Sequence, residues 1–114
     1  TEEKLVKTLN ILWRQKMSQP VFNSKPLNKL QQLMVITMEE CGELTQECSK
    51  IIRKYKKFNE LPEEDINKLK KEAADVYAML QLMIHNQLFD YVELEVNAKK
   101  KHEKLAKWST LLDE

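Results

Sequence analysis

The sequence predicts an all-α fold, a four- to five-helix bundle. The chain has one glycine in 114 residues, whereas soluble proteins average about 7%. Sandwiches, barrels and doubly wound sheets need glycine at many tight corners, so these classes are nearly excluded. The remaining composition is 42% hydrophobic and 32% charged. Together with long proline-free stretches whose apolar residues recur with period 3.6, it favours amphipathic helices.

The first helix is expected over residues 2–17, and prolines at positions 20 and 26 end it because the residue before a proline is pushed out of the helical region. The second helix is expected over residues 27–58, about 48 Å long at 1.5 Å per residue. Its apolar stripe is centred near Leu30 and Cys48. A compact domain of this size has a radius of gyration near 13 Å. Such a helix either kinks at Gly42 or projects into a partner subunit, so we expect an intersubunit helical core.

The third helix is expected over residues 64–87, after a loop around Pro62, and the fourth over residues 91–111. Short connections between these helices indicate neighbouring antiparallel packing. Three apolar residues of the third helix are expected at the subunit contact, namely Met79, Leu82 and Met83.

Size and charge limit the class of protein. A length of 114 residues suits one domain over residues 1–114 with a single core. The 19 Lys and Arg and 18 Asp and Glu residues give a net charge of +1, which gives no reason to expect a nucleic-acid partner or an anionic membrane. No apolar run approaches the roughly 18 residues of a membrane-spanning helix. We expect neither nucleic acid nor a membrane as a partner.

The two cysteines, Cys41 and Cys48, lie about 10 Å apart along one helix, which is too far for a disulfide between them. We expect buried free thiols that fill small spaces in the core, in a reducing cytoplasm.

Carboxylates occupy positions where they are costly. Glu40 and Glu43 line one edge of the apolar stripe on the second helix, and Glu72 and Asp75 lie inside the apolar arc of the third. A buried carboxylate must be protonated, paired or bound to a metal. Two i, i+3 pairs on antiparallel helices can form a four-carboxylate cage, which suits Mg²⁺ first and Mn²⁺ next. The alternative is solvated helix faces whose acids pair with lysines.

The string Glu-Glu-Cys-Gly-Glu-Leu at residues 39–44, followed by Glu-Ala-Ala-Asp-Val at residues 72–76, resembles the all-α nucleoside triphosphate pyrophosphohydrolases of the MazG type. Their signature is EExxE, a variable spacer and ExxD. The resemblance covers about residues 30–101 and extends to dimeric dUTPases and phosphoribosyl-ATP pyrophosphatases, which share the helical core.

The resemblance implies hydrolysis of a (deoxy)nucleoside triphosphate between the α and β phosphates, giving monophosphate and pyrophosphate. It implies that Glu39 orients or deprotonates the attacking water and that Mg²⁺ is held by Glu40, Glu43, Glu72 and Asp75. The family context also implies a homodimer or homotetramer with a shared base pocket.

Weaker candidates complete the expected site. The resemblance places Asn97, with Lys100 or Lys101, against the substrate phosphates. Lys54 is a further phosphate candidate, and Trp13 and Phe22 can stack on a base, although packing in the core is the alternative for both rings. The rival function is a helical oligomerisation or regulatory module with a structural cation site and no turnover.

Overall fold

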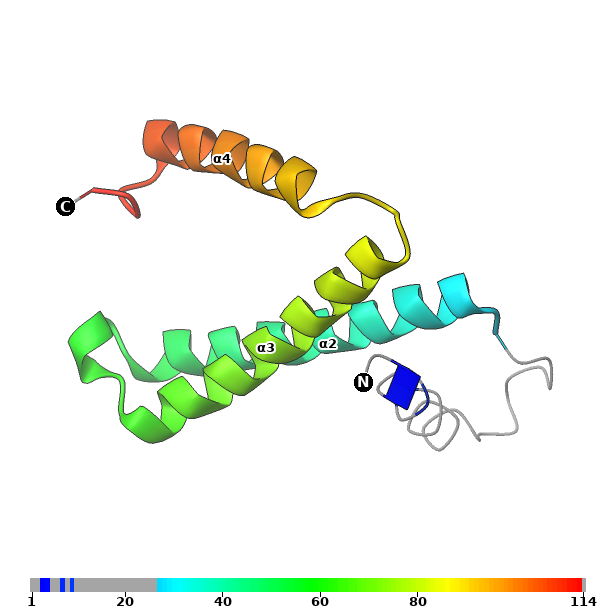
Figure 1. Ribbon diagram of the computed structural model, residues 1–114. Coiled ribbons are helices and arrows are strands. Elements are labelled where there is room, and N and C mark those ends of the chain that lie inside the picture. Colours follow the sequence, from blue (N-terminus) through cyan, green and yellow to red (C-terminus); the bar gives the residue numbers. More distant parts are fainter. Residues whose placement is uncertain (1–2, 5–6, 8, 10–26, 114) are drawn as a thin grey trace. The chain divides into compact units, whose positions relative to one another are not determined.

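The computed structural model describes residues 3, 4, 7, 9 and 27–113 (Figure 1). This part of the chain is helical and contains no strand, which confirms the all-α fold. Its elements are α2 (Lys29–Lys54), the 3₁₀ turn η1 (Phe58–Glu60), α3 (Glu63–His85) and α4 (Tyr91–Trp108). The number of helices in a complete bundle and its assembly stay predictions.

Little of the expected first helix is described. Glu3, Lys4, Lys7 and Leu9 are helical, and the Lys7 ammonium lies 3.9 Å from the Glu3 carboxylate one turn earlier. The other residues of that helix lie outside the described part, as do Trp13 and Phe22.

Helix α2 begins with a capping box. The side chain of Asn28 accepts a hydrogen bond from the Gln31 amide at 2.8 Å, and the Gln31 side chain accepts one from the Asn28 amide at 3.1 Å. Two amides that no helical carbonyl can reach are thereby satisfied. The helix is continuous through Gly42 and ends at Lys54, four residues before the expected end. Its 26 residues span about 39 Å.

The turn after α2 is held by side chains. Tyr55 is extended, and its hydroxyl donates to the Asp65 carboxylate in the first turn of α3. The Glu60 carboxylate accepts from the Lys56 amide at 2.9 Å. These bonds end α2 without a glycine or proline and start α3 beside it in the antiparallel direction (Figure 1).

Helix α3 ends in a Schellman motif. The Leu88 amide donates to the Met83 carbonyl at 3.1 Å, and the Gln87 amide donates to the Ile84 carbonyl at 3.0 Å. Gln87 takes a left-handed conformation with φ of 62°, which usually favours glycine. Asp90 then caps α4 by accepting from the Glu93 amide at 2.7 Å.

The chain divides into two compact units, residues 1–79 and residues 80–114. Leu33, Ile36 and Met79 are buried in the first unit, and Leu82 is buried in the second. The single domain over residues 1–114 stays a prediction. In the described ranges, no helix combines the length and the hydropathy needed to cross a membrane.

The buried face of α2 differs from the expected one. Leu33 and Ile36 are 8% exposed, and they lie on the same side as the acidic residues. The expected stripe residues Leu30 and Ile52 are 57% and 77% exposed. The centre of the buried face therefore lies about 90° round the helix from the expected centre, at 100° per residue.

One further expectation about packing is wrong, and the expected subunit contact stays a prediction. Cys41 and Cys48 are free thiols as expected, but both are exposed rather than buried in the core, because they lie on the side of α2 that turns away from α3. Met79 and Leu82 are already buried within a single chain, at 2% and 7% exposure. They therefore have little surface left to offer a second subunit.

Candidate metal centre

Four carboxylates meet between α2 and α3. Glu40 and Glu43 come from α2, and Glu72 and Asp75 come from α3. Each offers an oxygen, and these four oxygens lie within 4.8 Å of one another. The i, i+3 spacing puts each pair on one helix face, and the antiparallel arrangement puts the two faces together. All four side chains are half-buried, so the structure brings together the residues that the spacing singles out.

Glu72 has an oxygen that its surroundings do not satisfy. Its side chain is 15% exposed, and Oε1 lies 3.6 Å from the Lys71 ammonium. Oε2 is shielded from solvent and accepts no hydrogen bond from the described residues. Oε2 of Glu40 is likewise shielded from solvent. A desolvated carboxylate oxygen without a donor costs several kcal/mol, so a cation at this point removes a real penalty.

The spread of the oxygens suits a hard divalent cation. Mg²⁺ binds oxygen at about 2.1 Å and Ca²⁺ at about 2.3–2.6 Å, so opposite ligands of one ion lie roughly 4–5 Å apart. The observed limit of 4.8 Å falls within this range and needs only a small contraction for Mg²⁺. The donor set contains no histidine or cysteine, and all-oxygen sets favour Mg²⁺, Mn²⁺ or Ca²⁺.

An apolar layer borders the cluster. Ile36 lies one helical turn before Glu40, and Met79 lies one turn after Asp75. Their side chains are 8% and 2% exposed. Because the helices are antiparallel, both residues stand at the same end of the cluster. This layer fixes the spacing of the helices there and keeps water away from one side of the carboxylates.

Two expected site residues of α2 are not members of the four-oxygen group. Glu39 directly precedes Glu40 and is half-buried, but it is not a member of the group. Lys54 is exposed in the last turn of α2. It follows Glu43 by eleven residues, which is about 16 Å along the helix axis.

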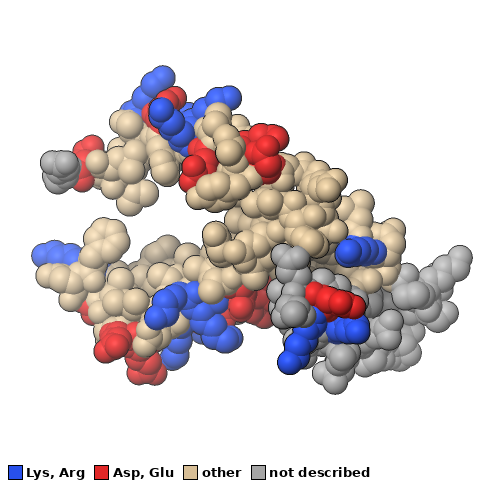
Figure 2. All heavy atoms as spheres, in the orientation of Figure 1, with Lys and Arg blue, Asp and Glu red and all other residues tan. Residues whose placement is uncertain are grey.

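The remaining phosphate candidates belong to α4. Asn97, Lys100 and Lys101 are exposed there, in the second unit. The Lys101 ammonium lies 5.3 Å from the centre of the Trp108 ring, which is within range of a cation–π interaction. Apart from Glu103, the acidic side chains of this helix come before its lysines (Figure 2). The role of these residues at the phosphates stays a prediction.

The structure adds two interactions that the sequence patterns missed. Lys71 forms an ion pair with Glu72, although adjacent helical residues usually diverge. Tyr55 and Asp65 join the two helices that carry the cluster, and this hydrogen bond raises the pKa of Tyr55 above its ordinary value. Desolvation and the negative charges of Asp65 and Glu64 raise it further. In the sequence, this hydrogen bond is indicated only by a tyrosine just before the loop and an acidic residue in the first turn after it.

Comparison of the chain with family models, with curated proteins and with solved structures gives no match. The resemblance to the MazG-type enzymes therefore depends on the acidic motifs at residues 39–43 and 72–75.

Proposed function

We propose that the chain is a Mg²⁺-dependent nucleoside triphosphate pyrophosphohydrolase of the MazG type. The observation that carries the proposal is the four-carboxylate cluster, in which two i, i+3 pairs on separate helices offer oxygens within 4.8 Å of one another. Four of the five acidic positions of the resemblance are these residues, and the fifth is Glu39. The buried, unsatisfied Oε2 of Glu72 adds a physical reason for a cation at that place.

Each acidic residue has a distinct part in the proposed reaction. Glu40, Glu43, Glu72 and Asp75 hold the ion, and Mn²⁺ is its expected substitute. Bound Mg²⁺ supplies positive charge to the phosphate oxygens and lowers the pKa of water. Glu39 orients the attacking water or takes its proton, and its half-buried position limits competition from bulk solvent. The bond that breaks lies between the α and β phosphates.

The substrate contacts belong to residues outside the cluster. A triphosphate and four carboxylates repel one another, so basic groups must help to bind the substrate. Asn97 with Lys100 or Lys101 is the main proposal for the phosphates, and Lys54 is a weaker one. Trp13 and Phe22 remain the weak proposals for the base.

The proposal also includes an oligomeric state and a cellular compartment. We retain the homodimer or homotetramer, which is supported by large apolar side chains left exposed on α2, among them Leu30, Met38 and Ile52. The cytoplasmic setting is retained with it, and the free thiols of Cys41 and Cys48 suit a reducing compartment. Nucleic acid and membranes are not partners in this proposal.

Pyrophosphate release from a panel of nucleoside triphosphates, with and without Mg²⁺, tests the activity. Glu72→Gln and Asp75→Asn should each lower turnover by at least roughly 100-fold, equivalent to about 2.7 kcal/mol of barrier. Glu64→Gln is the matched control, because Glu64 is exposed on the same helix and pairs with Lys68 at 3.4 Å. Full activity of the folded Glu72→Gln variant would refute the proposed role of the cluster.

The rival function, a regulatory or oligomerisation module with a structural cation, differs in one result. Calorimetric titration with Mg²⁺ would then show binding that Glu72→Gln abolishes, while no nucleoside triphosphate is hydrolysed. Measuring binding and turnover on the same samples separates the two functions.

A further inference from the structure

Lys71 is a basic residue at the edge of the acidic cluster, and the family resemblance assigns it no role. Its ammonium lies 3.6 Å from Oε1 of Glu72. The Glu72 side chain is 15% exposed and that of Lys71 is 73% exposed, so the lysine stands on the solvent side of this carboxylate. Asp75 follows Lys71 by four residues, which puts it on the same face of α3 one turn later. Lys71 therefore borders both acids that α3 contributes to the cluster.

The helix alone does not explain the direction of the Lys71 side chain. Adjacent helical residues point about 100° apart, so a lysine and the glutamate after it usually diverge. Lys71 nevertheless reaches Glu72. Four carboxylates whose oxygens lie within 4.8 Å of one another concentrate negative charge, which attracts a flexible ammonium. We therefore interpret Lys71 as a counter-ion of the cluster.

The pair of Lys71 and Glu72 is easily exchanged. An ion pair whose lysine is exposed contributes little to stability, because water solvates the ammonium nearly as well. Lysine carries its charge at the end of a flexible stem and lacks the rigid fork by which arginine holds a carboxylate. Oε2 of Glu72 is shielded from solvent and has no hydrogen-bond donor among the described residues. A divalent cation in the cluster can therefore replace Lys71 at Glu72 and free its ammonium.

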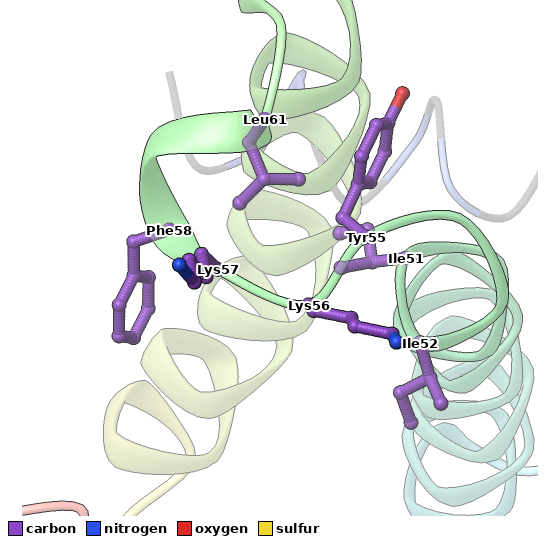
Figure 3. A pocket seen from close by; sticks show the side chains of 7 residues that line it. All are labelled: Ile51, Ile52, Tyr55, Lys56, Lys57, Phe58 and Leu61. Atoms are coloured by element: carbon purple, nitrogen blue, oxygen red, sulfur yellow. The ribbon is translucent and has the colours of Figure 1, made fainter.

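Other lysines of the same compact unit lie farther along the chain from the acidic pairs. Lys54 follows Glu43 by eleven residues, about 16 Å along the axis of α2. Lys56 and Lys57 come after the end of that helix, where they line a hollow of about 200 Å³ (Figure 3). Lys71, by contrast, forms an ion pair with a member of the cluster.

We propose that Lys71 binds a phosphate of the substrate once a cation has displaced it from Glu72. The inference rests on the part of the proposed function that brings a cation and a triphosphate to this cluster. Two oxygens that share one Mg²⁺ lie at most about 4.2 Å apart. The Lys71 ammonium starts 3.6 Å from a Glu72 oxygen, so it reaches such a phosphate without any movement of α3. Lys71 is then a substrate-binding residue in addition to those proposed on α4.

Loss of the Lys71 charge should have two effects of opposite sign. The ammonium repels a cation and competes with it for Glu72, so Lys71→Gln should tighten Mg²⁺ binding to the free protein about threefold. The same change removes a charged hydrogen bond to phosphate, so it should weaken triphosphate binding at least about tenfold. A lysine that acts only on stability would lower the melting temperature and change neither binding constant.

Calorimetric titrations measure both constants. The protein is titrated with Mg²⁺ alone and then, in excess Mg²⁺, with inorganic triphosphate, which needs no knowledge of the preferred base. Lys70→Gln is the matched control, because Lys70 is exposed on the same helix and lies about 200° round it from Glu72. It should change each constant less than about twofold. Lys71→Arg keeps the charge and should keep most of the triphosphate affinity. Circular dichroism confirms that the variants remain helical.

The outcomes separate this inference from the proposed function. Unchanged triphosphate binding in Lys71→Gln, an equal loss in Lys70→Gln, or a parent that does not bind inorganic triphosphate would overturn the role of Lys71. Hydrolysis of nucleotides with the same KM in the parent and Lys71→Gln would overturn it too and leave the proposed function intact. Triphosphate binding that depends on Lys71, in a parent that hydrolyses no nucleotide, would support Lys71 and refute the proposed hydrolysis.

Discussion

The two faces of α2 differ in charge and in cover. The face that packs on α3 carries Glu40 and Glu43 and is half-buried or buried, whereas the face with Met38 and Ile52 has no charge and is exposed. In most helices the apolar face is the covered one. The comparison teaches that the packed face of a helix can carry charge while another apolar face is exposed among the described residues. The proposed cation and the proposed homo-oligomer would account for both exceptions.

The largest expected effect compares two neighbouring positions. Ile36→Ala should destabilise the chain by about 2–4 kcal/mol, since deleting a buried side chain leaves a cavity. Met38→Ala should change stability by less than about 0.5 kcal/mol when measured at a concentration where the chain is monomeric. The two side chains are 8% and 74% exposed. Urea unfolding of both variants measures the difference. Similar losses would mean that both faces are covered within one chain.

The second prediction concerns the charge on the packed face. Without divalent ions, Glu72→Gln and Asp75→Asn should be as stable as the parent or more stable, because repulsion between carboxylates is reduced. Mg²⁺ at 100 times its dissociation constant should stabilise the parent by about 2.7 kcal/mol and the variants much less. Thermal melts with and without Mg²⁺ measure both effects. Loss of stability in both conditions would indicate that these acids act through lysine pairs instead.

A smaller effect is expected at the edge of the exposed face. Gly42→Ala should stabilise the monomer by up to about 1 kcal/mol, because alanine favours the helix and the added methyl group meets no atom of the chain within 4 Å. The same change should weaken the dimer of the proposed function, because glycine lets two helices approach closely. Unfolding at low concentration and sedimentation at high concentration measure the two effects on one sample. A gain in both monomer stability and dimer affinity would remove the argument for a close approach at this residue.

The smallest effect concerns the hydrogen bond from Tyr55 to Asp65, which joins the end of α2 to the start of α3. The raised pKa of Tyr55 means that the neutral hydroxyl is favoured in the folded chain. Its contribution to stability is complete below the ordinary pKa of 10.0 and is lost as pH rises through the higher folded value. Tyr55→Phe should therefore be less stable than the parent at neutral pH and equal to it in strong alkali. Urea midpoints of both proteins across that range measure it.

The bounds of the helices could be predicted more fully than which face of each helix is buried. The start of α4 at Tyr91 and that of α3 at Glu63 follow from capping residues and a proline. The end of α2 at Lys54 could not be predicted, because it depends on Tyr55 reaching Asp65 across the turn.

The acidic cluster followed from spacing, since i, i+3 pairs share a face whatever the tertiary structure. The covered face of α2 could not be predicted in the same way. Period 3.6 identifies an apolar stripe but does not tell whether the same chain or another one covers it. The expected burial of Cys41 and Cys48 was wrong for this reason.

Helix α2 is continuous through Gly42, so a rotation about its axis turns both faces together. A rotation of 10° about the helix axis moves an atom 5–6 Å from that axis by about 1 Å. The geometry of a metal or catalytic site tolerates about 0.5 Å. A rotation of α2 imposed at its exposed face would therefore also move Glu40 and Glu43.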